Sequence, residues 1–103
     1  MAIITLEKPV WLRIIGRYLE KIAMIFGERL TKVLVAPHPD DLVHDANVVI
    51  IVKKREESDF DKALEIARAL EKSMNLDITI LPYVAEENSI IELEAEGKWH
   101  DAG

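Results

Sequence analysis

The chain has 103 residues and a formal net charge of −6, and half of its residues are hydrophobic. The length predicts one domain over residues 1–103, and the absence of cysteine excludes disulfides, thiolate zinc sites and cysteine nucleophiles. The acidic charge argues against general binding of nucleic acids, and no apolar run approaches the roughly 20 residues that span a bilayer; we therefore expect a cytoplasmic protein without a membrane partner.

The first predicted element is a helix over residues 9–28, where apolar residues recur at intervals of three and four. Pro9 suits its first turn, because a proline lacks the N–H that would be unpaired there. Gly27 is expected to help stop the helix. Gly16 lies in the middle, where glycine is unfavourable, so we expect another element to pack closely against it.

Three strands are predicted after this helix. Residues 31–36 form a short segment rich in β-branched side chains, which is typical of a strand. Residues 46–52 are a continuous apolar run, which predicts a central strand covered on both faces. Residues 76–81 predict a third strand, which Pro82 closes.

Two further helices are predicted in the second half of the chain. The first has Ser58 as N-cap and Asp61 three positions later, in the manner of a capping box, and continues to about Met74 before ending at Asn75. The second covers residues 86–96 and is strongly acidic. The residues after it predict a frayed tail.

The resulting order is helix, strand, strand, helix, strand, helix. It predicts an α/β (α+β) fold with a small mixed sheet of three or four strands and helices packed on it. The loop over residues 37–45 is long for a small domain, and long loops often carry function. The basic run Lys53-Lys54-Arg55 predicts a solvated turn, with phosphate binding as the alternative.

Side chains with oxygen ligands gather near the predicted central strand. Asp45 and Asn47 should point to one side, because side chains alternate along a strand. Asp77 opens the third strand and would join them if the two strands are neighbours. Such a cluster could hold Mg²⁺ for phosphoryl transfer. The alternative is that all three are structural. Asp45 would end the loop, Asn47 would be a polar residue at the start of a strand, and Asp77 would be a solubilising charge on an edge strand.

Three segments carry a family resemblance: Asp45-Ala46-Asn47 before the apolar run, Asp77 on the third strand, and Glu96-Gly97-Lys98-Trp99 near the end. Together with the element order, they resemble the nucleotidyltransferase superfamily, which includes the minimal nucleotidyltransferases and DNA polymerase beta. The resemblance implies a nucleotidyltransferase-like fold, a Mg²⁺ site at Asp45 and Asp77, and a nucleotide as ligand.

Two departures from that family bear on activity. A Gly-Ser pair that grips nucleotide phosphates should end the first strand, but the chain has Ala36-Pro37 there. Asn47 replaces a carboxylate that would bridge two metals, and an amide is neutral. We therefore expect a degenerate member with impaired catalysis that acts as a binding or regulatory partner. The alternative is a divergent Mg²⁺-dependent nucleotidyltransferase that uses Asp45 and Asp77.

Partners are suggested by the first helix and by the resemblance. The apolar stripe of that helix, with Trp11 and Tyr18, predicts a homodimer or a contact with a separate helical protein. Minimal nucleotidyltransferases commonly pair with a helical partner in prokaryotic toxin–antitoxin systems. The resemblance therefore implies that a separate helical protein is a possible partner of this chain.

The loop after the first strand contains possible zinc ligands. His38, Asp41 and His44 lie close in sequence, and imidazole and carboxylate groups bind zinc. The run that ends in His38-Pro39-Asp40-Asp41 also resembles the metal loop of zinc-dependent N-acetylglucosamine deacetylases. That resemblance implies His38 and Asp41 as ligands and Asp40 as the group that activates water. A solvent-exposed loop with titrating histidines is the remaining interpretation.

Overall fold

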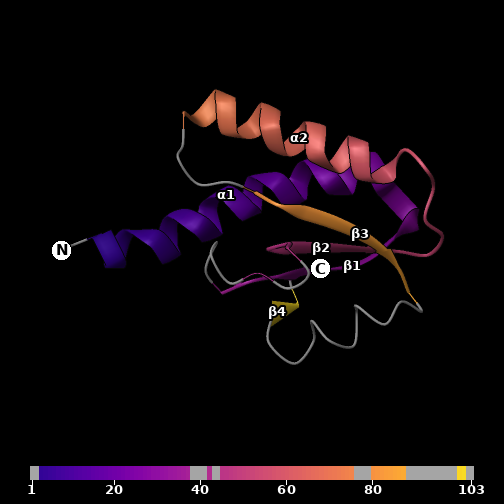
Figure 1. The fold of residues 1–103 in the computed structure, drawn as a ribbon, viewed down its shortest axis with the longest axis horizontal. Coiled ribbons are helices and arrows are strands. Elements are labelled where there is room, and N and C mark those ends of the chain that lie inside the picture. Colours follow the sequence, from indigo (N-terminus) through magenta and orange to yellow (C-terminus); the bar gives the residue numbers. More distant parts are fainter. Residues whose placement is uncertain (1–2, 38–41, 43–44, 76–79, 88–99, 102–103) are drawn as a thin grey trace.

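The computed structural model describes residues 3–37, 42, 45–75, 80–87 and 100–101. In the described part of the chain two strands follow the first α-helix and two follow the second, and both α-helices lie on the same side of the sheet (Figure 1). The elements are helix α1 (Ile3–Phe26), the short 3-10 helix η1 (Gly27–Arg29), strands β1 (Leu30–Val35) and β2 (Val48–Val52), helix α2 (Asp59–Met74), and strands β3 (Pro82–Glu86) and β4 (His100–Asp101).

The four strands form one mixed sheet in the order β3-β2-β1-β4. Strand β1 is antiparallel to both β2 and β4, whereas β2 and β3 are parallel. A parallel pair requires a crossover, and α2 supplies it. The predicted α/β class with a small mixed sheet is therefore confirmed.

The core lies on both faces of the sheet. Alternate residues of β1 and β2, such as Val33 and Ile50, pack against the two helices. The intervening residues, such as Leu34 and Val49, form a second buried cluster on the opposite face. Every residue of β2 is buried, which confirms the expectation of a central strand covered on both faces.

Helix α1 begins before the predicted start. Pro9 lies inside the helix and not in its first turn, because the helical backbone begins at Ile3. Gly27 follows the helix with a φ of +54°, the left-handed conformation that favours glycine and ends helices, as predicted. The close contact expected at Gly16 is wrong: no described atom lies within 4 Å of a Cβ placed there.

The aromatic residues of α1 point into the chain's own core. Trp11 and Tyr18 are fully buried, so the expectation that they form a protein–protein interface is wrong. The Trp11 Nε1–H donates to the Ala36 carbonyl at 2.8 Å. The Tyr18 hydroxyl donates to the Ala63 carbonyl at 2.9 Å. These two bonds fix α1 against the end of β1 and against α2.

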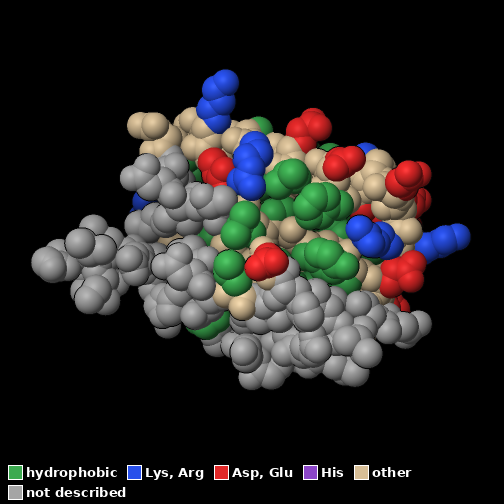
Figure 2. Space-filling model, in the orientation of Figure 1, with side chains coloured by type: hydrophobic (Ala, Val, Ile, Leu, Met, Phe, Trp, Pro, Cys, Tyr) green, Lys and Arg blue, Asp and Glu red, His purple; other side chains and the backbone are tan. Residues whose placement is uncertain are grey.

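Helix α2 begins and ends where the sequence predicts, but it lacks the predicted side-chain cap. Asn75 has a φ of +52° and its N–H bonds back to the last helical turn. Ser58 is the N-cap residue, but its side chain makes no capping hydrogen bond, so the predicted capping box is absent. Ala63, Ala67 and Leu70 form the buried stripe. Figure 2 shows hydrophobic side chains over α2 and β3, with charged groups around them.

The strand that neighbours β2 lies further along the chain than the predicted third strand; residues 76–79 of that prediction lie outside the described part, and Ile80 and Leu81 belong to no strand. Strand β3 begins at Pro82, which was expected to close it; a proline is tolerated at the first strand residue. Glu86 ends β3, so the expected acidic helix does not start there, and residues 88–96 lie outside the described part. Instead of fraying, His100 and Asp101 pair with β1. No described helix is both long and apolar enough to cross a membrane.

Candidate functional site

The end of β1 is the place where the resemblance predicts a phosphate-gripping Gly-Ser pair. Ala36 is buried there. Its N–H donates to the Asn47 carbonyl at 3.0 Å, and its own carbonyl accepts the Trp11 indole N–H. Pro37 follows and has no N–H. Neither residue offers a backbone donor to a phosphate.

Asn47 connects β2 to the segment that leads into β3. Its side chain is fully buried, and its Oδ1 accepts the Leu81 N–H at 2.8 Å. The Asn47 N–H in turn donates to the Leu81 carbonyl at 2.9 Å. The amide therefore acts as a bridge between two backbone segments, and its side-chain oxygen, the atom that would bind a metal, already accepts a hydrogen bond.

Asp45 does not share a surface with Asn47. It lies in a turn with a φ of +63° and is exposed, whereas Asn47 is buried. The period-two argument does not apply because β2 begins at Val48 and the turn precedes it. The carboxylate of Asp45 is consequently open to solvent, outside the sheet.

The other predicted ligands fall outside the described residues. These are Asp77 for Mg²⁺, and His38, Asp40, Asp41 and His44 for zinc. The neighbour of β2 in the sheet begins at Pro82, and it is Leu81 that Asn47 contacts. Within the described part of the chain, no three His, Asp or Glu side chains come together as a possible metal site.

Two side chains of α2 also bind the backbone of the residues just before β3. Arg68 of α2 donates to the Ile80 carbonyl at 3.2 Å, while the Ile80 N–H donates to the Glu71 carboxylate. Arg68 and Glu71 also pair with each other at 2.7 Å. The backbone groups of Ile80 and Leu81 are thus hydrogen-bonded to side chains of α2 and to Asn47, although neither residue belongs to a strand.

Tyr18 is held in a low-polarity environment beneath α2. Burial is the main cause that raises the pKa of the Tyr18 phenol well above its usual value. Arg68 opposes this shift and Glu71 adds to it. The phenol is therefore a neutral hydrogen-bond donor to Ala63 at physiological pH, with a structural role and no acid–base one.

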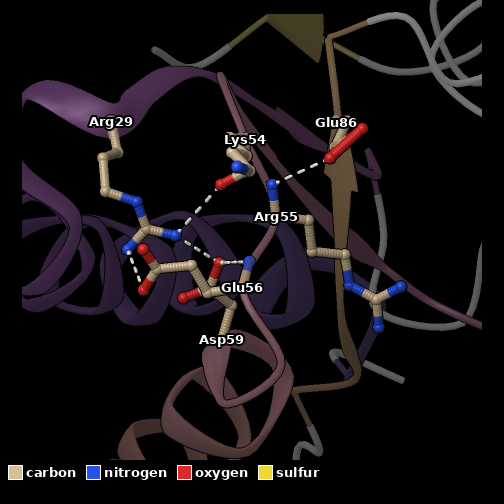
Figure 3. Close-up of polar contacts among 6 residues, drawn as sticks. All are labelled: Arg29, Lys54, Arg55, Glu56, Asp59 and Glu86. Atoms are coloured by element: carbon tan, nitrogen blue, oxygen red, sulfur yellow. Dashed lines mark hydrogen bonds and ion pairs between the residues drawn. The ribbon is translucent and has the colours of Figure 1, made fainter.

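The most polar buried cluster lies where β2 turns into α2 (Figure 3). Asp59 is fully buried, and its Oδ2 accepts both the Arg29 guanidinium and the Glu56 N–H, the latter at 2.7 Å. Arg29 also donates to the Lys54 carbonyl at 3.2 Å and pairs with the exposed Glu56 at 3.6 Å. This cluster joins η1 to the start of α2.

The sequence prediction missed this cluster, because Asp59 looked like an ordinary acidic residue in a first helical turn. The signal that could have found it is its partner: Arg29 stands directly before β1, the strand that neighbours β2. The single arginine neutralises the buried carboxylate of Asp59, and the cluster acts as a structural link.

The basic run also participates in the fold. The Arg55 N–H donates to Glu86 at 3.1 Å (Figure 3). Its guanidinium lies 5.7 Å from the centre of the Tyr83 ring, within the range of a cation–π contact. Lys53 and Lys54 remain exposed. This arrangement agrees with the predicted turn, in which all three basic residues are exposed and Arg55 also contacts β3.

Comparisons of the chain with protein-family models, with curated proteins and with solved structures find no match.

Proposed function

We propose that this chain is a nucleotidyltransferase-like domain that has lost ordinary transferase chemistry and functions by binding another protein. The observation that carries the proposal is the end of β1. A phosphate grip needs free backbone donors, and Ala36 and Pro37 supply none: the N–H of Ala36 bonds to Asn47, and Pro37 has no N–H.

The state of Asn47 supports the same proposal. A metal-bridging residue must present its oxygen to an open site. Asn47 instead is buried and accepts a hydrogen bond from Leu81. Asp45, the neighbouring carboxylate, is exposed and belongs to a turn. A pair of metals would lack the shared ligand that holds them together.

The alternative is a divergent Mg²⁺-dependent transferase that uses Asp45 and Asp77. A turnover assay separates the two functions. The purified chain is incubated with each of ATP, CTP, GTP and UTP, with and without Mg²⁺, and released pyrophosphate is measured. We expect no Mg²⁺-dependent release. Asp45→Asn is a change that keeps the turn. Mg²⁺-dependent release of pyrophosphate that disappears in this variant would show that the chain is a transferase.

A further inference from the structure

Helix α1 carries a row of basic side chains on its outer face. Arg13, Arg17 and Lys21 are all exposed and follow one another at intervals of four residues, which places them on one side of the helix. None of the three has an ion-pair partner within the described residues. We call these three residues the basic ridge.

A groove runs beside the basic ridge, between α1 and α2. It has a volume of about 530 Å³ and is lined by Arg17, Glu20, Lys21, Met24, Leu70 and Ser73. Met24 is 83% exposed, although it is a large apolar side chain. Leu70 is 4% exposed and supplies the apolar floor. The groove thus offers one exposed apolar side chain, Met24, beside the positive charges of Arg17 and Lys21 and the single negative charge of Glu20.

The basic ridge is unusual in this chain, which has 19 acidic and 13 basic residues. Like charges four residues apart repel each other and weaken a helix. A bound group with negative charge would remove this repulsion. The net charge of −6 disfavours long polyanions such as nucleic acids, which are repelled by the whole surface. A short acidic segment experiences mainly the local positive charge, because salt screens more distant charges.

We propose that the groove and the basic ridge bind an acidic amphipathic helix of a partner protein. Apolar side chains of that helix would cover Met24 and Leu70, and its carboxylates would pair with the ridge. The geometry fits a helix: residues four apart are about 6 Å apart along a helix axis, so carboxylates with this spacing can meet successive ridge residues. This inference rests on the proposed function and gives it a surface and a partner class.

The test uses a fluorescein-labelled synthetic helix of alanine, leucine and glutamate, with leucines on one face and glutamates beside them. Binding to the full chain is followed by fluorescence anisotropy. The double variant Arg17→Glu/Lys21→Glu should bind at least about ten-fold more weakly, because two attractive charges become repulsive. Glu20→Lys should bind more tightly for the same reason. Binding to the original chain should also weaken as salt is raised.

A matched control changes the same charge elsewhere. Lys53→Glu/Lys54→Glu alters two exposed lysines at the turn after β2 and should change affinity less than about two-fold, because that turn is not part of the groove. Met24→Ala should weaken binding with no change in charge. Circular dichroism checks that every variant is folded, which is expected since all changed side chains are exposed.

Three results would overturn the proposal. One is the absence of saturable binding by the original chain. Another is an equal loss of affinity in the Lys53/Lys54 control. The third is that phosphatidylserine vesicles bind through Arg17 and Lys21 while the acidic helix does not. Each of these leaves the proposed function standing, because a partner can bind elsewhere; Mg²⁺-dependent turnover of a nucleotide would contradict the proposed function whatever the helix does.

Discussion

At the scale of a single residue, Asn47 forms a bridge between two backbone segments. A carboxylate there would suit a metal, and the amide suits the backbone: it accepts the Leu81 N–H with a neutral, buried group. The hydrogen bond needs no counter-charge, so the site is stable without metal. This is the physical reason to assign Asn47 a structural role.

Replacing Asn47 by alanine tests that role. The change leaves the Leu81 N–H without its acceptor, so the free energy of unfolding should fall by about 1–3 kcal/mol. Urea unfolding at constant pH measures it. The control is Asp45→Asn, which removes an exposed charge and tolerates the left-handed turn; it should change stability by less than about 0.5 kcal/mol. Equal effects of the two variants would show that Asn47 is not a structural bridge.

The Arg29–Asp59 pair is asymmetric in its burial. The side chain of Arg29 is 31% exposed, whereas Asp59 is fully buried. Arg29→Met leaves a buried carboxylate without a cation and should cost about 3–5 kcal/mol. Asp59→Asn leaves a guanidinium that water can reach, and should cost only about 1–3 kcal/mol.

Chemical unfolding of both single variants and of the double variant Arg29→Met/Asp59→Asn gives the coupling free energy. The double variant should cost less than the sum of the two single changes. Glu56→Gln is the control, since its ion pair with Arg29 is exposed and should contribute less than about 1 kcal/mol. A larger loss for Asp59→Asn than for Arg29→Met would contradict this description of the cluster.

At the scale of elements, the glycine inside α1 and the glycine that follows it should respond in opposite ways to replacement by alanine. Gly16 lies in an exposed part of the helix with no described atom near a Cβ placed there, so Gly16→Ala should stabilise the protein by about 0.5–1 kcal/mol. Gly27 has a positive φ, so Gly27→Ala should destabilise it by about 1–2 kcal/mol. Thermal unfolding of both variants compares them; the same sign for both would be inconsistent with the backbone described.

The sequence predicts elements well where local patterns decide them. Three features were sufficient: the apolar periodicity predicted helix α1, the continuous apolar run predicted strand β2, and Asn75 predicted the end of α2. Strand β3 was misplaced because Pro82 reads equally well as the end of one strand or the start of another. The choice depends on pairing with β2, a contact between distant parts of the chain.

The candidate site was less predictable than the fold. Residue types suggested a cluster of oxygen ligands at Asp45, Asn47 and Asp77, but Asp45 is exposed in a turn with a positive φ, Asn47 is buried, and Asp77 lies outside the described residues. The buried cluster at Asp59 and the clamp of Arg68 on Ile80 depend on contacts over 30 and 12 residues of sequence, respectively. Such contacts leave no local pattern, because each partner alone looks like an ordinary charged residue of a solvated surface.

At the scale of the whole molecule, the fold is fastened at both ends of the sheet by polar contacts that the chain makes with itself. Trp11 and Asn47 engage the backbone where β1 ends and β2 begins. Arg29 and Asp59 fasten the opposite end, where β2 meets α2. These polar groups stabilise the domain, and the basic ridge of α1 remains directed to solvent.

The most direct test of this account is the thermal unfolding midpoint of the chain with ATP, CTP, GTP or UTP, each with and without Mg²⁺. A specific ligand at 100 times its Kd would stabilise the fold by about 2.7 kcal/mol, enough to raise Tm by about 10 °C or more in a domain of this size. We predict no Mg²⁺-dependent rise with any of the four. A rise that is specific for one nucleotide, requires Mg²⁺ and is lost in Asp45→Asn would contradict the account.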